Sequence, residues 1–201
     1  MNQISKKEYI VHTICYETAN KLIVDNHYAK GMSNTASHIY GLFKRSDPFK
    51  LLGTAVFMIA PQGVALQYGN GTYKDVLTLS RFVLIPDMPK NSASFLLGSS
   101  IREIKKLNRY NCLVTYADTS ENHTGTIYKA TNWTYIGTVK GAAKYTDKDG
   151  KLVCRKSTKT RSAATMKRLY KYEGYSIKHK FIYRLTVKKQ KPKYKQMNLF
   201  V

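Results

Sequence analysis

The 201-residue chain has few cysteines, few acidic residues and no long hydrophobic run. Its three cysteines, Cys15, Cys112 and Cys154, are far apart and odd in number, which argues against a disulfide framework and fits a reducing cytoplasm. The most apolar run, LLGTAVFMIAPQGVAL, is interrupted by Pro61 and Gly63 and is too short to span a bilayer. The first ten residues lack the apolar core of a signal peptide. We therefore expect a cytoplasmic protein without a membrane partner.

Acidic residues are scarce, because 12 Asp and Glu stand against 34 Lys and Arg, for a formal net charge of +22. The excess is concentrated at one end. Residues 1–139 hold 15 basic and 9 acidic side chains, whereas residues 140–201 hold 19 basic and 3 acidic ones. Such an excess opposes compaction by self-repulsion and predicts a polyanionic partner, with nucleic acid the first candidate and an anionic membrane the second.

The basic last third also contains interleaved aromatic residues, as in RLYKYEGYSIKHKFIYRL. Cations contact phosphates, and aromatic faces stack on bases, so this pattern favours nucleic-acid binding. A solvated basic tail that only aids solubility is the alternative. The predicted DNA contacts are Arg155, Lys156, Lys159, Arg161, Lys167, Arg168, Lys171, Lys178 and Lys180.

One pair of potential metal ligands, His12 and Cys15, occurs in the stretch HTIC. Side chains alternate between the two faces of a strand, and no second pair completes a zinc set. The sequence therefore predicts no metal site. It leaves the oligomeric state open.

Apolar periodicity predicts strands that alternate with helices, hence an α/β (α+β) class with a mixed central sheet flanked by helices. Strands are expected over 8–15, 37–45, 51–61, 76–86, 112–118, 134–139 and 179–187, and helices over 18–26, 91–110, 123–133 and 162–172. Asn and Ser residues before the second helix suggest side-chain capping. A hairpin is expected around Asp149-Gly150. We predict a single domain, with a catalytic body over 1–139 and a basic insertion, final strand and tail over 140–201.

This order of elements resembles the GCN5-related N-acetyltransferase (GNAT) fold, most clearly over residues 76–137. The resemblance implies a coenzyme A donor, acetyl-CoA or a related acyl donor, held at a helix N-terminus by free N–H groups and the helix dipole. The residues implied are Val83 and Leu84 for the pantetheine arm, and Lys90, Asn91, Ser92, Ala93 and Ser94 for phosphate. The family's glycine-rich signature is missing, with Ser92 and Ser94 near the glycine positions. The alternative is a helix that simply packs on the sheet.

Four stretches are similar to the Mom family of phage DNA-modification proteins: DNHYAKG, LSRFVLIPD, TYADTSENHTGTIYKATNWTYIGTVKG and KHKFIYRL. That resemblance implies a divergent GNAT enzyme of phage origin that acts on adenine N6 in double-stranded DNA in the bacterial cytoplasm. The group would be carbamoylmethyl or acyl, and the modification would protect phage DNA from restriction. The catalytic residues implied are His27, Tyr28, Asp118 and Tyr128.

The expected chemistry assigns each residue a role. Asp118, at the end of a buried strand, would accept a proton from the weakly nucleophilic adenine amine. Tyr128 would protonate a leaving thiolate or stabilise negative charge. His27 would act as a second base or orient the adenine, and Tyr28 would stack on it. Each of three residues also has a purely structural alternative. Asp118 would cap the following loop, Tyr128 would pack as an aromatic ring, and His27 would bond carbonyls at a helix end. Arg81 is either a carboxylate partner or a site residue.

Two other functions remain open. The first is an acyl-CoA-dependent N-acetyltransferase for a protein, an RNA or a small amine, in which Tyr128 and the CoA loop keep their roles. The second is a non-catalytic nucleic-acid-binding protein on a GNAT scaffold, which the missing glycine signature favours.

Overall fold

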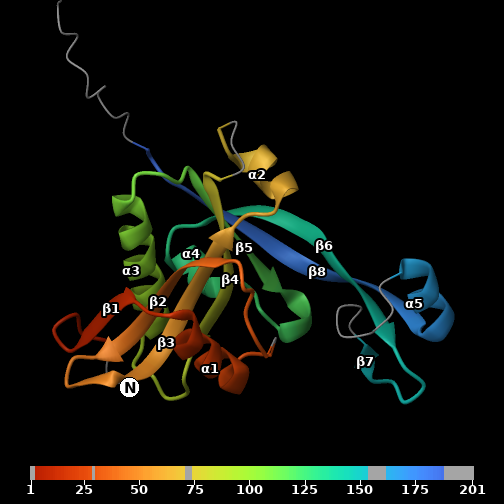
Figure 1. The fold of residues 1–201 in the computed structure, drawn as a ribbon, viewed down its shortest axis with the longest axis horizontal. Helices are drawn as coiled ribbons and strands as arrows, with labels where there is room; N and C mark the ends of the chain where they lie inside the picture. The colour runs from red at the N-terminus through yellow and green to blue at the C-terminus, as the bar shows by residue number, and fades with distance from the viewer. Residues whose placement is uncertain (1–2, 29, 71–73, 154–161, 188–201) are drawn as a thin grey trace, which may run out of the picture. The chain divides into compact units, whose positions relative to one another are not determined.

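The computed structural model describes residues 3–28, 30–70, 74–153 and 162–187 of the chain (Figure 1). These residues divide into two compact units. The first comprises Met1–Leu113 and Arg184–Val201, and the second comprises Val114–Tyr183. The division predicted at residue 140 on charge alone falls inside a continuous strand, β6 (Thr134–Thr146), because strand pairing continues through the change in charge density.

The first unit is built on four antiparallel strands in sequence order. They are β1 (Tyr9–Thr13), β2 (Ala36–Lys44), β3 (Asp47–Ile59) and β4 (Val76–Leu84). Its helices are α1 (Tyr16–Asn26), α2 (Gln62–Tyr68) and α3 (Ser92–Lys106). The register shifts once between β3 and β4, where Val56 pairs with Arg81 but Phe57 pairs with Leu79. Ser80 is therefore an extra residue that makes a β-bulge in β4.

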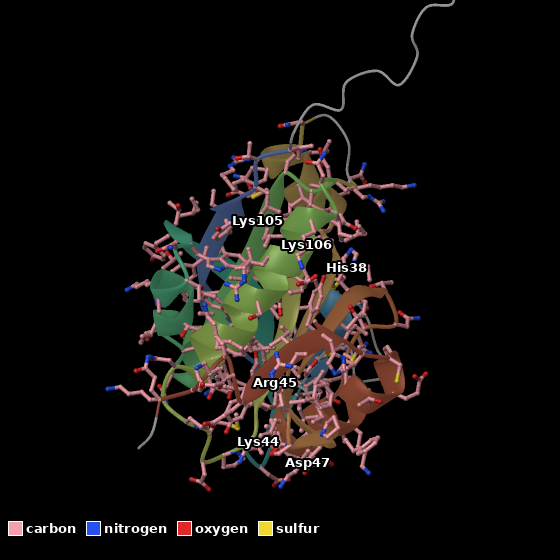
Figure 2. The ribbon with its side chains drawn as sticks, turned by 90° about the vertical axis from the view of Figure 1, so that its left-hand side faces the viewer. His38, Lys44, Arg45, Asp47, Lys105 and Lys106 are labelled. Carbon is pink, nitrogen blue, oxygen red and sulfur yellow. The ribbon has the colours of Figure 1, made fainter. Side chains whose placement is uncertain are left out.

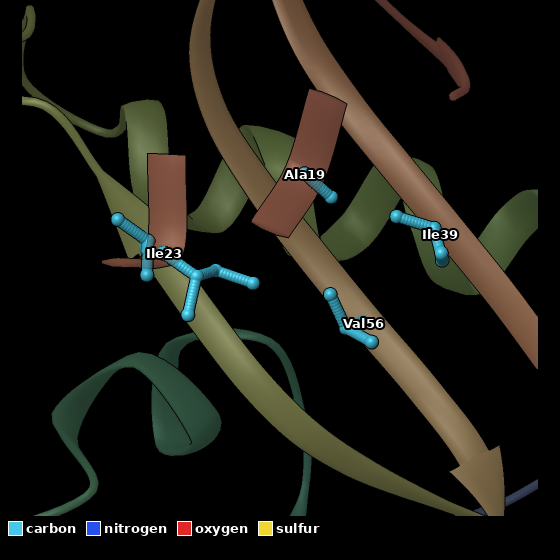
Figure 3. Close-up of a cluster of buried hydrophobic side chains, with 5 residues drawn as sticks. Ala19, Ile23, Ile39 and Val56 are labelled. Atoms are coloured by element: carbon cyan, nitrogen blue, oxygen red, sulfur yellow. The ribbon is translucent and has the colours of Figure 1, made fainter. Parts of the chain in front are cut away.

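Helix α1 packs on one face of this sheet. Ala19 and Ile23 are four residues apart, so they lie on the same side of the helix, and both are fully buried. They contact Ile39 of β2, Val56 of β3 and Val83 of β4 (Figure 3). Burial of each large aliphatic side chain contributes about 1.5–3 kcal/mol, so this small cluster fixes the helix to the strands.

Helix α3 packs against β1, β2 and β3. Its apolar positions repeat at helical spacing, and Leu96, Leu97, Ile101 and Ile104 are all buried. Tyr40 lies next to Ile39 along β2, so its side chain points to the opposite face from the α1 cluster. Burial, together with the nearby charge of Glu103, raises the pKa of Tyr40 to about 12. The phenol therefore stays protonated at physiological pH.

The second unit contains strands in the order β5-β8-β6-β7. Its elements are β5 (Cys112–Asp118, which begins in the first unit), the short 3-10 helix η1 (Thr119–Glu121), α4 (Thr126–Ala130), β6, β7 (Leu152–Val153), α5 (Ala163–Leu169) and β8 (Lys171–Arg184). β6 and β8 form a long antiparallel ribbon that pairs from Thr134 with Ile182 to Thr146 with Lys171. β7 pairs with the end of β6, which confirms the hairpin predicted around Gly150.

Strands and helices on both faces of the first sheet confirm the predicted mixed α/β class, although several details differ. The predicted side-chain cap of α3 is wrong, because Asn91 has φ 69° in the left-handed region and its side chain makes no capping bond. Helix α2 was not predicted. Helix α5 ends at Leu169, three residues early, because β8 begins at Lys171. Among the described residues, no helix is both long and apolar enough to cross a membrane.

A histidine–tyrosine pair lies on the α3 side of the first unit, where His38 is labelled in Figure 2. The His38 Nε2 and Tyr110 Oη atoms are 2.6 Å apart, and the rings meet edge to face. Burial lowers the pKa of His38 below its usual value, and the nearby Arg109 charge adds to this effect. Burial likewise raises the pKa of Tyr110. Both groups are therefore neutral in the folded protein near pH 7.

We predict that His38 makes the stability of the protein depend on pH. The unfolded chain takes up a proton on this histidine near pH 6.5, whereas the folded chain resists protonation. The stabilisation is complete above that pH and is lost as the pH falls through the lower pKa of the folded state. Between pH 7.5 and 5, the melting temperature of wild type should fall further than that of His38→Gln. A His12→Gln variant controls for removal of an exposed histidine, and parallel melting curves for wild type and His38→Gln would contradict the prediction.

Candidate active site and nucleic-acid interface

Asp118 is the last residue of β5 and is 8% exposed. The strand CLVTYAD is almost entirely buried, so it carries a carboxylate into the interior of the second unit. Both carboxylate oxygens have partners. Oδ1 accepts hydrogen bonds from the Ser120 backbone N–H at 3.1 Å and from the Ser120 hydroxyl at 2.6 Å. Oδ2 forms an ion pair with Lys178 Nζ at 2.9 Å.

These contacts determine the charge of Asp118. Burial alone would raise the pKa of the carboxyl, since an isolated charge is costly away from water. The hydrogen bonds from Ser120 and the ammonium of Lys178 outweigh burial and hold the pKa below its ordinary value. Asp118 is therefore ionised at neutral pH and held in a fixed orientation, which suits it to accept a hydrogen bond from an amine.

His27 and Tyr28 follow α1 in the first unit. His27 is the C-terminal cap of the helix, and its N–H donates to the Ile23 carbonyl at 2.8 Å. The two rings stack with centroids 4.3 Å apart, and Tyr28 is 50% exposed. The structure thus places these two predicted site residues together as one aromatic pair at the end of a helix.

Arg81 connects the segment after α1 to β4. Its Nε donates to the Gly31 carbonyl and its Nη1 to the Ser80 carbonyl, each at 2.7 Å. The guanidinium thus bonds to backbone carbonyls, where the sequence suggested either a carboxylate or a substrate as its partner. Because Ser80 is the bulged residue, Arg81 also satisfies a carbonyl that the irregular strand displaces.

Tyr128 lies on α4, half-buried between aromatic rings of the second unit. Its ring centroid is 5.6 Å from that of Trp133 and 5.2 Å from that of Phe181. Gly125 precedes the helix with φ 74°, and a Cβ atom there would lie 2.3 Å from Phe181 Cζ. Only glycine satisfies both conditions, so Gly125 allows the close packing that positions Tyr128.

Trp133 is 5% exposed, and its indole Nε1 has no hydrogen-bond partner among the described residues. A buried N–H without a partner is costly, and such groups are uncommon in folded proteins. An unused donor therefore lies in the ring cluster that holds Tyr128. Apart from being the single tryptophan of the chain, Trp133 carries no sequence feature that predicts this unused donor.

The predicted donor-binding loop fits a phosphate group only in part. Helix α3 begins at Ser92, whose N–H donates to the Pro89 carbonyl at 3.2 Å, so an anion site at this helix N-terminus would depend on the N–H groups that follow it. However, the Ser92 hydroxyl donates to the Pro89 carbonyl at 2.6 Å, and the Ser94 hydroxyl donates to the Asn91 carbonyl at 3.0 Å. The two serine hydroxyls thus close the loop on itself. Backbone N–H groups near Ala93 and the exposed Lys90 are the remaining donors suited to phosphate.

Val83 and Leu84 differ in their suitability for a pantetheine arm. The Ile85 N–H donates to Leu52 O, so alternation along the antiparallel ladder turns the backbone groups of Val83 toward β3 and those of Leu84 away from it. The Val83 side chain is buried in the α1 cluster. Leu84 is therefore the better candidate of the two for backbone contact with a donor.

The nine predicted DNA contacts fall into three groups. Arg155, Lys156, Lys159 and Arg161 lie outside the described residues. Lys167, Arg168 and Lys171 are exposed around the end of α5, where Lys167 lies 5.3 Å from the Tyr172 ring centroid and Lys171 pairs with Glu173.

The remaining two predicted contacts are less accessible than the others. Lys180 is only 6% exposed, so little of its side chain reaches the surface. Lys178 is committed to Asp118 by the ion pair. The sequence could not separate these lysines from their exposed neighbours, because all lie in one basic stretch.

Exposed aromatic side chains occur along the β6–β8 ribbon, with Tyr135 46% and Tyr175 51% exposed. Tyr135 Oη lies 3.1 Å from His179 Nδ1, and Lys140 Nζ lies 5.7 Å from the Tyr175 ring centroid. Such combinations of cations and rings suit contact with phosphates and bases. In the described parts of the chain, no cluster of three or more histidine, cysteine or acidic side chains is placed to hold a metal.

Comparison with known sequences gives two matches. The sequence profile of the Mom protein family matches residues 8–199. A curated relative, methylcarbamoylase mom of Escherichia phage Mu, is 29% identical over 134 residues, which cover 65% of this chain and 54% of the relative. The chain thus spans about half the length of that relative.

Solved structures with the same fold include several N-acetyltransferases. The Arabidopsis thaliana NAA60 structure gives a TM-score of 0.59 at 9% identity, covering 90% of this chain and 99% of that one. Spermidine N-acetyltransferase from Vibrio cholerae gives 0.55 at 8% identity, over 90% and 98%. The Escherichia coli ribosomal-protein-S18-alanine N-acetyltransferase gives 0.52 at 12% identity, over 93% and 99%. At these identities the likeness concerns the fold alone, and it confirms the predicted GNAT-like architecture.

We predict that Gly125→Ala destabilises the protein more than Gly150→Ala does. Both glycines have nearly the same positive φ, 74° and 76°, but a Cβ at Gly150 meets nothing within 4 Å. The backbone cost of about 1 kcal/mol is therefore shared, and only Gly125→Ala adds overpacking against Phe181, worth about 1–3 kcal/mol. Chemical denaturation of both variants measures the difference. Equal losses of unfolding free energy would show that the Phe181 contact is not tight.

Proposed function

The chain belongs to the Mom protein family, and from this we propose that it is a phage DNA-modification transferase acting on adenine N6 in double-stranded DNA. The transferred group is either an acyl group, taken from acetyl-CoA or a related thioester with the thiolate as leaving group, or a carbamoylmethyl group, which acetyl-CoA alone cannot supply. The modification protects phage DNA from restriction in the host cytoplasm. The observation that carries the proposal is the ionised, oriented carboxylate of Asp118 at the end of β5. The name of the phage Mu relative supports transfer of such a group.

Asp118 acts on the amine. The N6 lone pair of adenine is delocalised into the ring, which makes the nitrogen a poor nucleophile. A carboxylate that accepts a hydrogen bond from N6–H raises the electron density on nitrogen and receives the proton as the new bond to carbon forms. The bonds from Ser120 hold Oδ1 in place, so the carboxylate needs no reorganisation when the amine arrives.

The tyrosines and His27 serve the leaving group and the base. Tyr128 carries a phenolic proton that it can donate to a departing thiolate, and packing against Trp133 and Phe181 holds the ring that carries this proton. Half-exposed Tyr28 offers a ring face for stacking on adenine. His27, stacked on Tyr28, orients the base or acts as a second proton acceptor. Donor phosphates would contact the N-terminal turn of α3.

DNA must change shape to reach these groups. Adenine N6 is paired and stacked within a duplex, so the base is flipped out at a cost of a few kcal/mol. Contacts between cations and phosphates offset that cost, and Lys167, Arg168 and Lys171 around α5 supply exposed positive charge.

A second candidate is an N-acetyltransferase that modifies a protein, RNA or small-amine acceptor, since the solved structures of like fold are N-acetyltransferases. In this candidate the acceptor of the transferred group is different, but Tyr128 and the N-terminal turn of α3 keep the roles described above. Acetyl transfer to peptide amines without any need for DNA would favour this candidate.

We predict a new deoxyadenosine adduct in plasmid DNA from bacteria that express the protein. Nucleoside mass spectrometry detects it, and its mass identifies the transferred group. Asp118→Asn keeps the shape of the side chain but removes the charge, and should lower adduct formation at least about 100-fold. The modified plasmid should also resist restriction enzymes that have adenine in their sites.

Asp149→Asn is the matched control, because it makes the same chemical change at an exposed turn residue of the β6–β7 hairpin. It should leave adduct formation unchanged. Unmodified DNA from cells containing soluble wild-type protein would contradict the proposal. Equal adduct levels in wild type and Asp118→Asn would show that the reaction does not need the Asp118 carboxylate. Another group would then accept the proton from the amine.

We predict that duplex binding weakens steeply with salt, because each neutralised phosphate releases counterions. In a Lys167→Gln/Arg168→Gln variant, two exposed cations of α5 are lost. The slope of log binding constant against log salt should then fall by about 0.9 for each phosphate contact removed. Fluorescence anisotropy with a labelled duplex at several salt concentrations measures the slope.

Lys44→Gln/Arg45→Gln provides a matched control for that measurement. It also removes one lysine and one arginine, from the exposed end of β2 and the turn that follows it (Figure 2). Net charge falls equally in the two variants, so a difference in slope reports local contact. Equal slopes in both variants would mean that DNA responds only to total charge and that α5 is not part of the interface.

A further inference from the structure

The role of the ion pair between Lys178 and Asp118 follows from how the lone pairs of the carboxylate are divided among its hydrogen-bond partners. A carboxylate has about four lone-pair sites. In the described structure, Ser120 uses two of them on Oδ1, through its N–H and its hydroxyl, and Lys178 uses one on Oδ2. One site on Oδ2 is therefore left for a substrate N–H, next to the ammonium group.

Several contacts fix Lys178 in the position to make this pair. Thr119, the residue after Asp118, donates its hydroxyl to the Ile177 carbonyl at 2.7 Å, so the loop and β8 are joined at two consecutive positions. Gly141 of β6 leaves room for the lysine stem. A Cβ at Gly141 would lie 2.8 Å from Lys178 Cε and 2.2 Å from Ser176 Oγ.

We propose that Lys178 is a positioning residue for the reaction, holding Asp118 Oδ2 so that a single acceptor site faces the exocyclic amine of the base. This inference rests on the proposed function. Lys178 acts through Asp118 and makes no covalent step of its own. The proton released by the amine goes to the carboxylate, whose charge Lys178 balances before the proton arrives.

A purely structural ion pair would behave differently. Partly exposed ion pairs contribute little to stability, typically less than about 1 kcal/mol. If Lys178 only stabilised the fold, its loss would change the melting temperature and leave the plateau rate of the reaction unchanged. Within the described parts of the chain, the groups that interact with the Asp118 carboxylate are Ser120 from η1 and Lys178 from β8, and of these two only Lys178 is charged. Its removal should therefore raise the pKa of Asp118.

The test compares Lys178→Met with Lys178→Arg and Thr119→Val in the full-length protein. Carbon-13 NMR of the Asp118 carboxyl gives its pKa directly, and the rate of DNA adduct formation is measured from pH 5 to 9. In Lys178→Met the Asp118 pKa should rise, the acidic limb of the rate profile should move to higher pH by the same amount, and the plateau rate should fall between about 10- and 100-fold. Lys178→Arg should restore both the limb and most of the rate.

Thr119→Val is the structural control, since it breaks the neighbouring bond between the loop and β8 without removing charge. It should leave the Asp118 pKa at the wild-type value. An unchanged Asp118 pKa in Lys178→Met would overturn the inference, as would a raised pKa with an unmoved rate profile. The carboxyl titration needs no DNA. The two proposals can therefore fail separately. If the Asp118 pKa rises in Lys178→Met but the wild-type protein forms no adduct, the ion pair exists in solution and the proposed reaction is refuted.

Discussion

The second unit depends on the compensation of one buried negative charge. An ionised carboxylate is costly away from water unless opposite charge and hydrogen bonds replace its hydration. Asp118 obtains both from Ser120, two residues along the chain, and from Lys178, on a strand sixty residues later. β8 therefore has to lie next to β5, and β6 has to carry glycine at position 141 so that the lysine stem fits.

The large positive charge of the chain conceals several different uses of lysine. Lys178 neutralises a carboxylate, Lys180 is buried, and Lys167 and Lys140 lie over tyrosine rings. Only exposed cations contribute fully to the field that attracts a polyanion. The net charge of +22 therefore argues for a nucleic-acid partner without identifying the residues that would contact it.

The elements that the sequence predicted well are those with a strong local signal. α1 and α3 have apolar residues at helical spacing, and β5 is a continuous apolar run that ends at Asp118. Helix α2 is only seven residues long, too short for periodicity to distinguish it from the apolar run before it.

In the candidate site, too, features with a local sequence signal were predictable and features set by the fold were not. The pairing of His27 with Tyr28 is local, and the Asp-Thr-Ser order at the start of η1 is a recognisable turn signal. The partnership of Asp118 with Lys178 is set by which strands become neighbours, and no local pattern encodes it. The αL conformation of Asn91 is likewise fixed by the fold and not by the capping preference of asparagine.

A carboxylate held by a lysine is a weak base, and this limits how such a site could activate an amine. The lower pKa of Asp118 means that the proton of N6–H is not removed in advance of bond formation. What the carboxylate offers instead is a fixed direction and a hydrogen bond that strengthens as positive charge develops on nitrogen. Both effects grow when water is excluded, because electrostatic interactions strengthen at low dielectric. A flipped adenine that displaces water from Oδ2 would provide this condition, so base extrusion and amine activation would be coupled through the same oxygen atom.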